Sequence, residues 1–263
     1  MRTSALRGLF LVLLLSAACA PEHSEVRVMI SGGLAAAYTA VLPQLEESIE
    51  ASVVTSQGSS MGTSPTAIPV RLARGESADV LIMVGYALDS LVRAGHVRPD
   101  SRVELAYSGI GMVVRAGAPR PNIDDVESLR RTLMAAGSIA YSASASGRYL
   151  STELFPRLGI ADPLQVTARE IVGERVGTVV ARGDAEIGFQ QISELLPIPG
   201  VDFIGPLPPE VQRITTYAAG ITTDSRNPDL AKRLIEFMAD SANAAIRNSG
   251  MDPASLSRSQ PSR

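Results

Sequence analysis

The sequence contains very few of the residues that hold metals or form disulfides. It has one cysteine, Cys19, and two histidines, His23 and His96, among 263 residues, and it has no tryptophan. A single cysteine excludes an intrachain disulfide and a cysteine-based metal site. Two histidines without a cluster of acidic ligands do not indicate zinc. We therefore expect neither a metal site nor a bound cofactor.

The chain also has no excess of positive charge. The formal net charge is −3, and 19% of the residues are charged against 45% that are hydrophobic. An acidic chain is a poor partner for nucleic acid, so an anionic ligand would have to be held by local geometry and not by a broad basic surface. The hydrophobic share is too high for a disordered chain, and the length suffices for one large or two smaller domains.

The N-terminus has the parts of an export signal. Arg2 and Arg7 form a basic region, residues 9–15 are apolar, and small residues precede Cys19. The apolar run is shorter than the stretch of about 20 residues that spans a bilayer, so residues 1–19 are predicted to be a signal peptide. A cysteine after small residues predicts lipid attachment at Cys19, with simple secretion as the alternative. We expect the protein to be periplasmic or a membrane-anchored extracytoplasmic lipoprotein.

Strand and helix patterns alternate along the rest of the chain, which predicts an α/β fold. Residues 78–84 are a continuous apolar run, typical of a strand buried in a parallel sheet. The first unit is expected to contain strands 26–30, 51–55 and 78–84 and helices 34–50 and 68–74. The second unit is expected to contain strands 110–115, 138–141 and 185–190 and helices 123–136, 147–158 and 175–182.

Two units of similar size predict two lobes, each a mainly parallel sheet flanked by helices, joined by two crossing strands. We expect the crossings near residues 106–109 and 216–220, and a C-terminal helix at 229–241 that returns to the first lobe. The predicted organisation is a linker at 20–25, lobe 1 at 26–106, lobe 2 at 107–216, a return to lobe 1 at 217–253 and a disordered tail at 254–263.

Three junctions between a strand and a helix are rich in serine and glycine. They are Ser31-Gly32-Gly33, Gly58-Ser59-Ser60 and Ser144-Ala145-Ser146-Gly147. Ligands of open α/β sheets bind at the carboxyl ends of strands, where a helix N-terminus offers free N–H groups and serine adds a hydroxyl. The three junctions predict a clamp for a small anion, although each serine could also serve only as an N-cap.

These segments give the chain a resemblance to the molybdate-type branch of the periplasmic binding proteins, which have the type II fold. The resemblance also rests on RGESADV at 74–80, GRY at 147–149 and RGDAEIG at 182–188, in the expected order. It implies that an anion is held by serines at the first two junctions, by backbone N–H groups and by a tyrosine. The corresponding positions here are Ser31, Ser59 or Ser60, Ala145, Val176 and Gln191.

Two departures from this pattern point to a larger ligand. Gln191 stands where a tyrosine is expected, and its amide both donates and accepts hydrogen bonds. Residues 61–69 form an insertion that would reshape the mouth of the cleft. Both features favour a planar carboxylate, for which Arg71 and Arg148 offer bidentate pairing. Either arginine could instead simply be solvated at the surface.

The resemblance implies a monomer that captures a small anion, either a molybdate-like oxyanion or a small carboxylate, and delivers it to an ABC permease in the inner membrane. The chain also resembles the bacterial aconitate isomerases, which share the fold. That alternative implies a 1,3-proton shift between cis- and trans-aconitate and needs an acid/base group beside the carbon. Glu194, Tyr141 and Tyr149 are candidates, and the sequence does not choose among them.

A serine-hydrolase motif is present but lacks its partners. The segment Gly58-Ser59-Ser60-Met61-Gly62 matches G-x-S-x-G and follows a strand, as the nucleophile of an α/β hydrolase does. The only histidine that follows it, His96, comes too soon to leave room for the strands that such enzymes place in between. Hydrolysis is therefore not expected.

Overall fold

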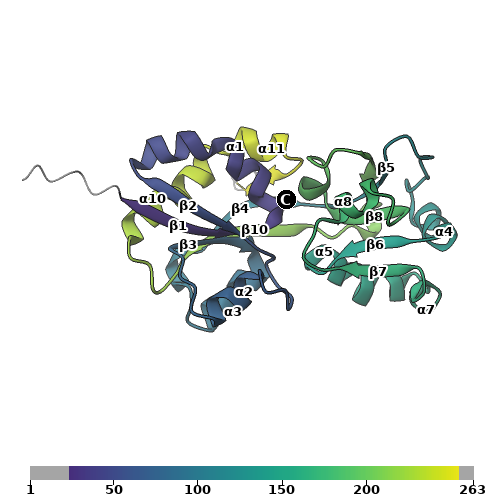
Figure 1. The fold of residues 1–263 in the computed structure, drawn as a ribbon, viewed down its shortest axis with the longest axis horizontal. Coiled ribbons are helices and arrows are strands. Elements are labelled where there is room, and N and C mark those ends of the chain that lie inside the picture. The colour runs from purple at the N-terminus through teal and green to yellow at the C-terminus, as the bar shows by residue number, and fades with distance from the viewer. Residues whose placement is uncertain (1–23, 255–263) are drawn as a thin grey trace, which may run out of the picture.

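The computed structural model describes residues 24–254, which form two α/β lobes lying side by side (Figure 1). Each lobe has its own sheet, so the predicted two-lobed α/β fold is confirmed. The predicted signal peptide with Cys19, most of the predicted linker and the tail from residue 255 onward lie outside the described residues.

Lobe 1 is built on a six-stranded sheet. Its strands are β1 (Glu25–Ile30), β2 (Ser52–Gln57), β3 (Val80–Val84), β4 (Val103–Ser108), β10 (Thr215–Ile221) and β11 (Asp252–Pro253). They follow the order β11-β4-β10-β3-β1-β2. β2, β1 and β3 run parallel, whereas β10, β4 and β11 pair antiparallel. The sheet is therefore mixed, with its parallel half where the sequence predicted parallel strands.

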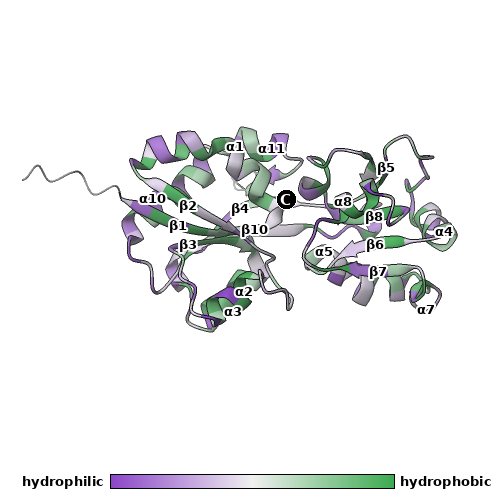
Figure 2. Ribbon diagram, in the orientation of Figure 1, coloured by the Kyte–Doolittle hydropathy of each residue, from purple (hydrophilic) through white to green (hydrophobic). Residues whose placement is uncertain are grey.

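Helices cover both faces of this sheet (Figure 1). They are α1 (Gly32–Ile49), α2 (Ile68–Ala73), α3 (Gly85–Arg93), α10 (Pro228–Asp240) and α11 (Asn243–Asn248), with a 3-10 turn at Pro99–Ser101. α1 buries Leu34, Tyr38 and Leu45 in the core, and all residues of β3 are buried. Figure 2 shows β3 as a largely hydrophobic strand inside the lobe. α10 packs against α1, so the chain returns to lobe 1 after lobe 2.

Lobe 2 is built on a five-stranded mixed sheet with the order β7-β6-β8-β5-β9, in which β7, β6 and β8 are parallel. Its strands are β5 (Ile110–Arg115), β6 (Ile139–Ser142), β7 (Ala168–Ile171), β8 (Ile187–Gln191) and β9 (Val201–Pro206). Its helices are α4 (Val126–Ala135), α5 (Ala145–Tyr149), α6 (Phe155–Arg157), α7 (Ala161–Leu164), α8 (Val176–Ala181) and α9 (Ile192–Leu195), with a 3-10 turn at Pro209–Val211. The helix predicted at 147–158 consists of α5, a π-helical turn at Leu150–Leu154 and α6.

The chain crosses between the lobes twice, at Gly109 and through residues 207–214. The first crossing lies within the predicted range. The second comes earlier than the predicted 216–220, because that segment pairs with β3 and β4 inside the sheet of lobe 1. Ala218 and Ala219 are fully buried there. Their small side chains give no alternation of polar and apolar residues by which the sequence would reveal the strand.

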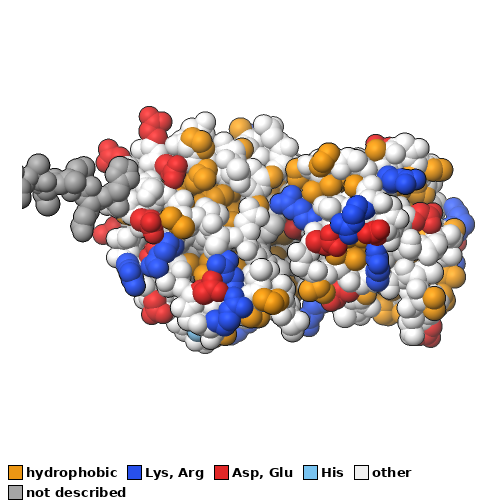
Figure 3. All heavy atoms as spheres, in the orientation of Figure 1, with side chains coloured by type: hydrophobic (Ala, Val, Ile, Leu, Met, Phe, Trp, Pro, Cys, Tyr) orange, Lys and Arg blue, Asp and Glu red, His pale blue; other side chains and the backbone are white. Residues whose placement is uncertain are grey.

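The described residues contain neither a membrane-crossing helix nor a metal cluster. Within 24–254, no helix is both long and apolar enough to span a bilayer. The same residues contain no group of three or more His, Cys, Asp or Glu side chains that could hold a metal ion. On the face shown in Figure 3, basic and acidic side chains are interspersed over both lobes. A charged ligand approaching this face must find its partners locally.

Candidate functional site

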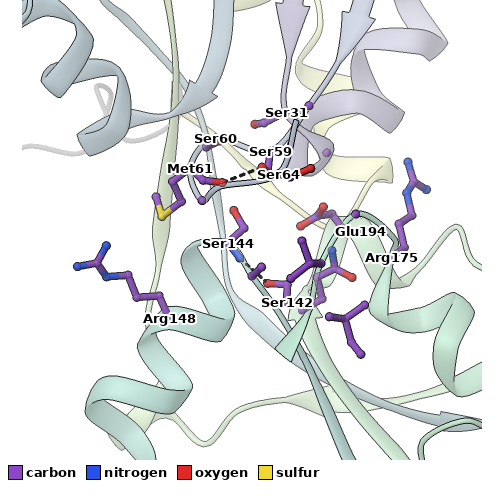
Figure 4. Close-up of a pocket in the computed structure, with 18 of the residues that line it drawn as sticks. Ser31, Ser59, Ser60, Met61, Ser64, Ser142, Ser144, Arg148, Arg175 and Glu194 are labelled. Atoms are coloured by element: carbon purple, nitrogen blue, oxygen red, sulfur yellow. Dashed lines mark hydrogen bonds between the residues drawn. The ribbon is translucent and has the colours of Figure 1, made fainter. Parts of the chain in front are cut away.

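A cleft of about 610 Å³ lies between the lobes (Figure 4). Lobe 1 contributes the residues that follow β1 and β2, and lobe 2 contributes those at or after the ends of β6, β7 and β8. The carboxyl ends of the parallel strands therefore face each other, at the edge where open α/β sheets bind ligands. The polar side chains of the wall include Ser31, Ser59, Ser60, Ser144, Arg148, Arg175, Gln190, Glu194 and Tyr217.

Ser31 presents a hydroxyl group that no protein atom satisfies. The residue is 3% exposed, and its Oγ has no hydrogen-bond partner. Ser31 stands at the N-cap of α1, yet its side chain makes no capping bond, and the first turn of α1 contains no acidic residue. Ser31, Gly32 and Gly33 line the cleft, so the N-terminus of an 18-residue helix borders it, and such a helix end attracts an anion.

The second junction is held more tightly by the protein itself. Ser59 Oγ donates to the Met61 carbonyl at 2.7 Å. Ser60 is buried and its Oγ accepts a hydrogen bond from the Val84 N–H at 3.0 Å. Because a hydroxyl can accept and donate at once, Ser60 still has its proton to offer, whereas the proton of Ser59 is already used.

The residues of the third junction, 144–147, do not all face the cleft. Ser144 lines the cleft, and its backbone N–H donates to Ser142 Oγ at 3.4 Å. Ser146 is turned inward, where its Oγ lies 2.9 Å from Ser142 Oγ. Ala145 lines an adjoining cavity of about 780 Å³, and Arg148 lines both cavities. The junction therefore brings Ser144 and Arg148 to the cleft, but not Ser146.

Three other predicted contacts are absent from the cleft wall. Arg71 Nε donates to Glu76 Oε2 at 2.7 Å, so its charge is balanced within lobe 1. The Val176 N–H, at the start of α8, donates to Gln190 Oε1 at 3.0 Å and is already satisfied. Gln191 is 1% exposed. The structure gives these residues protein partners, and a role in ligand binding is not supported by where they lie.

Gln191 instead connects the two crossings between the lobes. With its amide nitrogen facing the first crossing, it donates to the carbonyl oxygens of Ser108 at 3.3 Å and Gly109 at 3.2 Å. In that orientation its amide oxygen accepts from Thr215 Oγ1 at 2.9 Å, where the second crossing ends. The preceding residue, Gln190, lines the cleft. Successive residues of a strand point to opposite sides. Gln190 therefore lines the cleft, whereas its neighbour Gln191 contacts the segments that cross between the lobes.

Glu194 extends from α9 of lobe 2 to the helix end of lobe 1. A Cβ atom added to Gly32 would overlap Oε1 of Glu194, so the carboxyl group lies against the N-terminus of α1. Burial raises the pKa of Glu194 from 4.5 to about 7, despite the opposing effects of the Arg175 charge and of a hydrogen bond with Gln190. Figure 4 shows Glu194 between Ser31 and Ser142, with Arg175 beside it. A carboxyl group with this pKa exchanges protons near neutral pH.

Tyr217 is a cleft residue that sequence reasoning missed. It is 2% exposed, and a Cβ atom added to Gly33 would overlap its hydroxyl. Burial, and secondarily the negative charge of Glu194, raise its pKa. Tyr217 is therefore a hydrogen-bond donor at neutral pH. Its signal in the sequence was weak, because it lies in a strand of small buried residues far along the chain from the three junctions.

The other two candidate proton carriers lie elsewhere. Tyr149 donates its hydroxyl to the Val211 carbonyl at 2.7 Å. Tyr141 packs its ring edge-on against Phe155, with the ring centres 6.0 Å apart, and it does not line the cleft. Of the three candidates, the structure brings only Glu194 to the cleft wall.

Comparison with known proteins agrees with this architecture. Residues 26–252 match a family described as bacterial extracellular solute-binding protein. The chain is 45% identical over 231 residues to a Pseudomonas sp protein named aconitate isomerase, and the match covers 88% of each sequence.

Solved structures share the fold at lower identity. The periplasmic molybdate-binding protein of Azotobacter vinelandii matches with a TM-score of 0.69 and 21% identity, over 86% of this chain and 98% of that one. A sulfate-binding protein of Mycobacterium tuberculosis matches with a TM-score of 0.69 and 19% identity, over 89% of this chain and 88% of that one. These two matches concern the fold, and they confirm the molybdate-binding-protein-like architecture expected from the sequence.

Proposed function

The chain belongs to the family of bacterial extracellular solute-binding proteins, and we propose that it uses the cleft of that fold to interconvert cis- and trans-aconitate. The proposal rests on Glu194, a carboxyl group in the cleft with a pKa raised to about 7. The 45% identity to an aconitate isomerase supports the same reaction. An extracytoplasmic location agrees with the family, and lipid attachment at Cys19 is part of the proposal.

The reaction needs one proton to move between two carbons. In aconitate, a methylene carbon and a vinyl carbon flank the same central carbon. A base removes a proton from the methylene, and the electron pair of the broken C–H bond spreads over the three carbons into the neighbouring carboxylate. Returning the proton to the former vinyl carbon forms the new C–H bond and moves the double bond. The proton count is unchanged, so no redox partner is needed.

Glu194 suits the role of proton carrier in both half-reactions. With a pKa of about 7, the side chain is part carboxylate and part acid near neutral pH. The carboxylate takes the proton from the methylene, and the resulting acid returns it to the other carbon. Positioned acid–base groups contribute about 10²–10⁴-fold to such reactions, and most when their pKa lies near the working pH.

The remaining polar groups suit a substrate with several carboxylates. The free hydroxyl of Ser31 and the N-terminus of α1 can hold one carboxylate, and they stabilise negative charge that develops there. The Tyr217 hydroxyl lies beside this helix end. Arg148 and Arg175 stand on opposite sides of the cleft (Figure 4), where they can pair with carboxylates of a substrate that spans it.

The test is direct turnover of purified protein. Incubation with either isomer should change the ultraviolet absorbance until the same mixture is reached from both sides, and in D2O deuterium should enter the methylene position. Glu194→Gln should reduce kcat at least about 100-fold while citrate still raises the melting temperature. Glu170→Gln, which removes another carboxylate of the cleft wall, is the matched control. Absence of isomerisation by the wild type would overturn the proposal.

Capture without turnover is the second candidate, because the fold is that of solute-binding proteins. It would make the protein a monomer that hands an oxyanion or a carboxylate to an ABC permease. Thermal-shift measurements with molybdate, tungstate, sulfate, citrate and both aconitates separate the two. Stabilisation by molybdate alone would favour capture, and stabilisation by tricarboxylates with turnover would favour the isomerase.

A further inference from the structure

Gln190 is placed between the start of α8 and the carboxyl group of Glu194. It is the fourth residue of β8, it is 5% exposed, and it lines the cleft. Its Oε1 accepts a hydrogen bond from the Val176 N–H at 3.0 Å. This bond determines the orientation of the Gln190 amide, because only its oxygen can accept a hydrogen bond from the Val176 N–H.

The other end of the amide is then available to Glu194. With Oε1 turned to Val176, the NH2 group of Gln190 is the donor in the hydrogen bond with Glu194. A donated hydrogen bond favours the ionised form of a carboxyl group, whereas burial favours the neutral form. Gln190 therefore both directs the carboxyl group and counteracts the effect of burial on it.

Other charged and titratable groups around Glu194 act on it from different elements. Arg175, at the start of α8, attracts the carboxylate. Tyr217 of β10, whose hydroxyl lies against Gly33, interacts electrostatically with Glu194 and with Tyr86 of α3. The N-terminus of α1 lies against the carboxyl group. α9 is only four residues long and holds the backbone of Glu194 but not the direction of its side chain.

We propose that Gln190 is a positioning residue, which aims the Glu194 carboxyl group at the N-terminus of α1 and holds it ready to ionise. This inference rests on the proposed function, in which Glu194 carries the proton. Gln190 itself need not touch the substrate. The Val176 N–H, through its bond to Oε1, gives the amide one fixed orientation.

The most informative variant is Gln190→Glu. A glutamate keeps an oxygen that can accept from the Val176 N–H, but it replaces the donor to Glu194 with a second carboxylate oxygen. Two carboxylates that share a site cannot both ionise easily, and one of them titrates at a higher pH. The rise of kcat/KM with pH should move upward by at least about one pH unit. At high pH the activity should recover toward that of the wild type.

Gln57→Glu is the matched control, because it adds the same charge to the wall of the cleft from lobe 1. It should leave the midpoint of the pH profile in place, whatever it does to KM. A role of Gln190 in folding alone would lower the rate equally at every pH and leave the midpoint unmoved. That result for Gln190→Glu would overturn the inference.

A second measurement does not depend on turnover. Carbon-13 labelling of the glutamate carboxyl groups allows their titration by NMR, and the signal of Glu194 is the one missing from Glu194→Gln. Its midpoint should rise in Gln190→Glu and stay in Gln57→Glu. If the protein turns over no aconitate but the midpoint moves, the proposed function fails and the link between the two residues stands. If turnover is present and the midpoint stays, only the inference about Gln190 fails.

Discussion

The Glu194 carboxyl group is held in a place that favours its neutral form. Removing the group from water disfavours its charge, and neither Arg175 nor the Gln190 amide compensates fully, so the pKa rises to about 7. The nearby end of α1 is a positive dipole end, which attracts the carboxylate and also attracts any ligand carboxylate. In the proposed reaction, the end of α1 would therefore attract both the proton carrier and a carboxylate of the substrate.

The pH dependence of kcat/KM follows from this pKa. In the proposed isomerisation, Glu194 must be ionised in the free protein to take a proton, so kcat/KM should increase about tenfold per pH unit below the pKa of about 7 and level off above it. Initial rates from pH 5 to 9, with both isomers as substrate, would measure this. A profile with its midpoint near pH 4.5 would show that the working base is an ordinary exposed carboxylate.

Gly32→Ala tests the contact between the two lobes at a single atom. The added Cβ would overlap Oε1 of Glu194, and the carboxyl group would have to turn away from the helix end. We expect a loss of kcat of about 10-fold or more, in keeping with the sensitivity of catalysis to displacements of about 1 Å. Gly75→Ala, at a glycine with a positive φ and nothing near its Cβ position, controls for changed stability. Equal kcat in Gly32→Ala and wild type would contradict the geometry.

At the scale of single residues, the sequence predicted the type of site better than it predicted which residues line the cleft. Ser31 was predicted from its place after a strand, and Glu194 was one of three candidate proton carriers. Gln190 was overlooked in favour of Gln191, because a pattern of residues does not show which of two neighbours faces the cleft. Tyr217 was overlooked because its partners, Gly33 and Glu194, are distant in the sequence.

At the scale of the elements, Asp79 lies directly before β3 and connects this strand to two other segments by hydrogen bonds. It is fully buried and accepts hydrogen bonds from the backbone N–H groups of Arg27 in β1 and of Arg226 before α10. Burial alone would raise its pKa, but these bonds, with that of Ser225, outweigh it and lower the pKa. The stability that Asp79 contributes is therefore present above pH 4 and is lost as the pH falls through its lowered pKa.

Asp79→Ala should destabilise lobe 1 by about 2–4 kcal/mol, because two partly buried backbone N–H groups lose their acceptor. Urea unfolding at pH 7 would measure the free energy of unfolding. Glu127→Ala is the control, since Glu127 forms exposed ion pairs with Arg130 at 3.9 Å and with Arg131 at 3.8 Å, and such pairs contribute about 0.3–0.5 kcal/mol each. Similar losses in the two variants would mean that the Asp79 network is dispensable.

The sequence predicted most strands of the parallel half of each sheet well, and it also predicted the antiparallel strand β5. β1, β3, β5 and β8 lie within about two residues of their predicted positions, because buried apolar runs mark them. It missed the parallel edge strand β7 and the antiparallel strands β4, β9 and β10. Their residues are small, or only half-buried, or interrupted by proline, and their pairing is decided by the other lobe elements around them.

At the scale of the whole molecule, Glu194 also couples stability to pH. Its folded-state pKa of about 7 is above the unfolded value of 4.5, so the folded state binds the proton more tightly. Stability should therefore decrease as the pH rises from about 4.5 to 7 and stay level above that. Because the side chain is partly exposed to the cleft, we expect a contribution of roughly 1–3 kcal/mol.

The comparison of wild type with Glu194→Gln isolates this contribution, since the other titrating groups are shared. Urea unfolding at pH 5 and at pH 7.5 should show that the variant gains stability relative to the wild type at the higher pH. A difference between the two proteins that is the same at both pH values would mean that Glu194 titrates normally in the folded chain.

The contact of Glu194 with the end of α1 joins opposite lobes. The Glu194 carboxyl group therefore lies at the position that a substrate carboxylate would take. Protonation of Glu194 removes the repulsion between its carboxylate and an incoming carboxylate. Binding of a carboxylate ligand should therefore be accompanied by uptake of a proton from the buffer by Glu194. Mild acid should also let the lobes approach each other in the absence of any substrate. A compact profile in solution scattering below pH 6 would then report the protonation of one side chain and not a filled site.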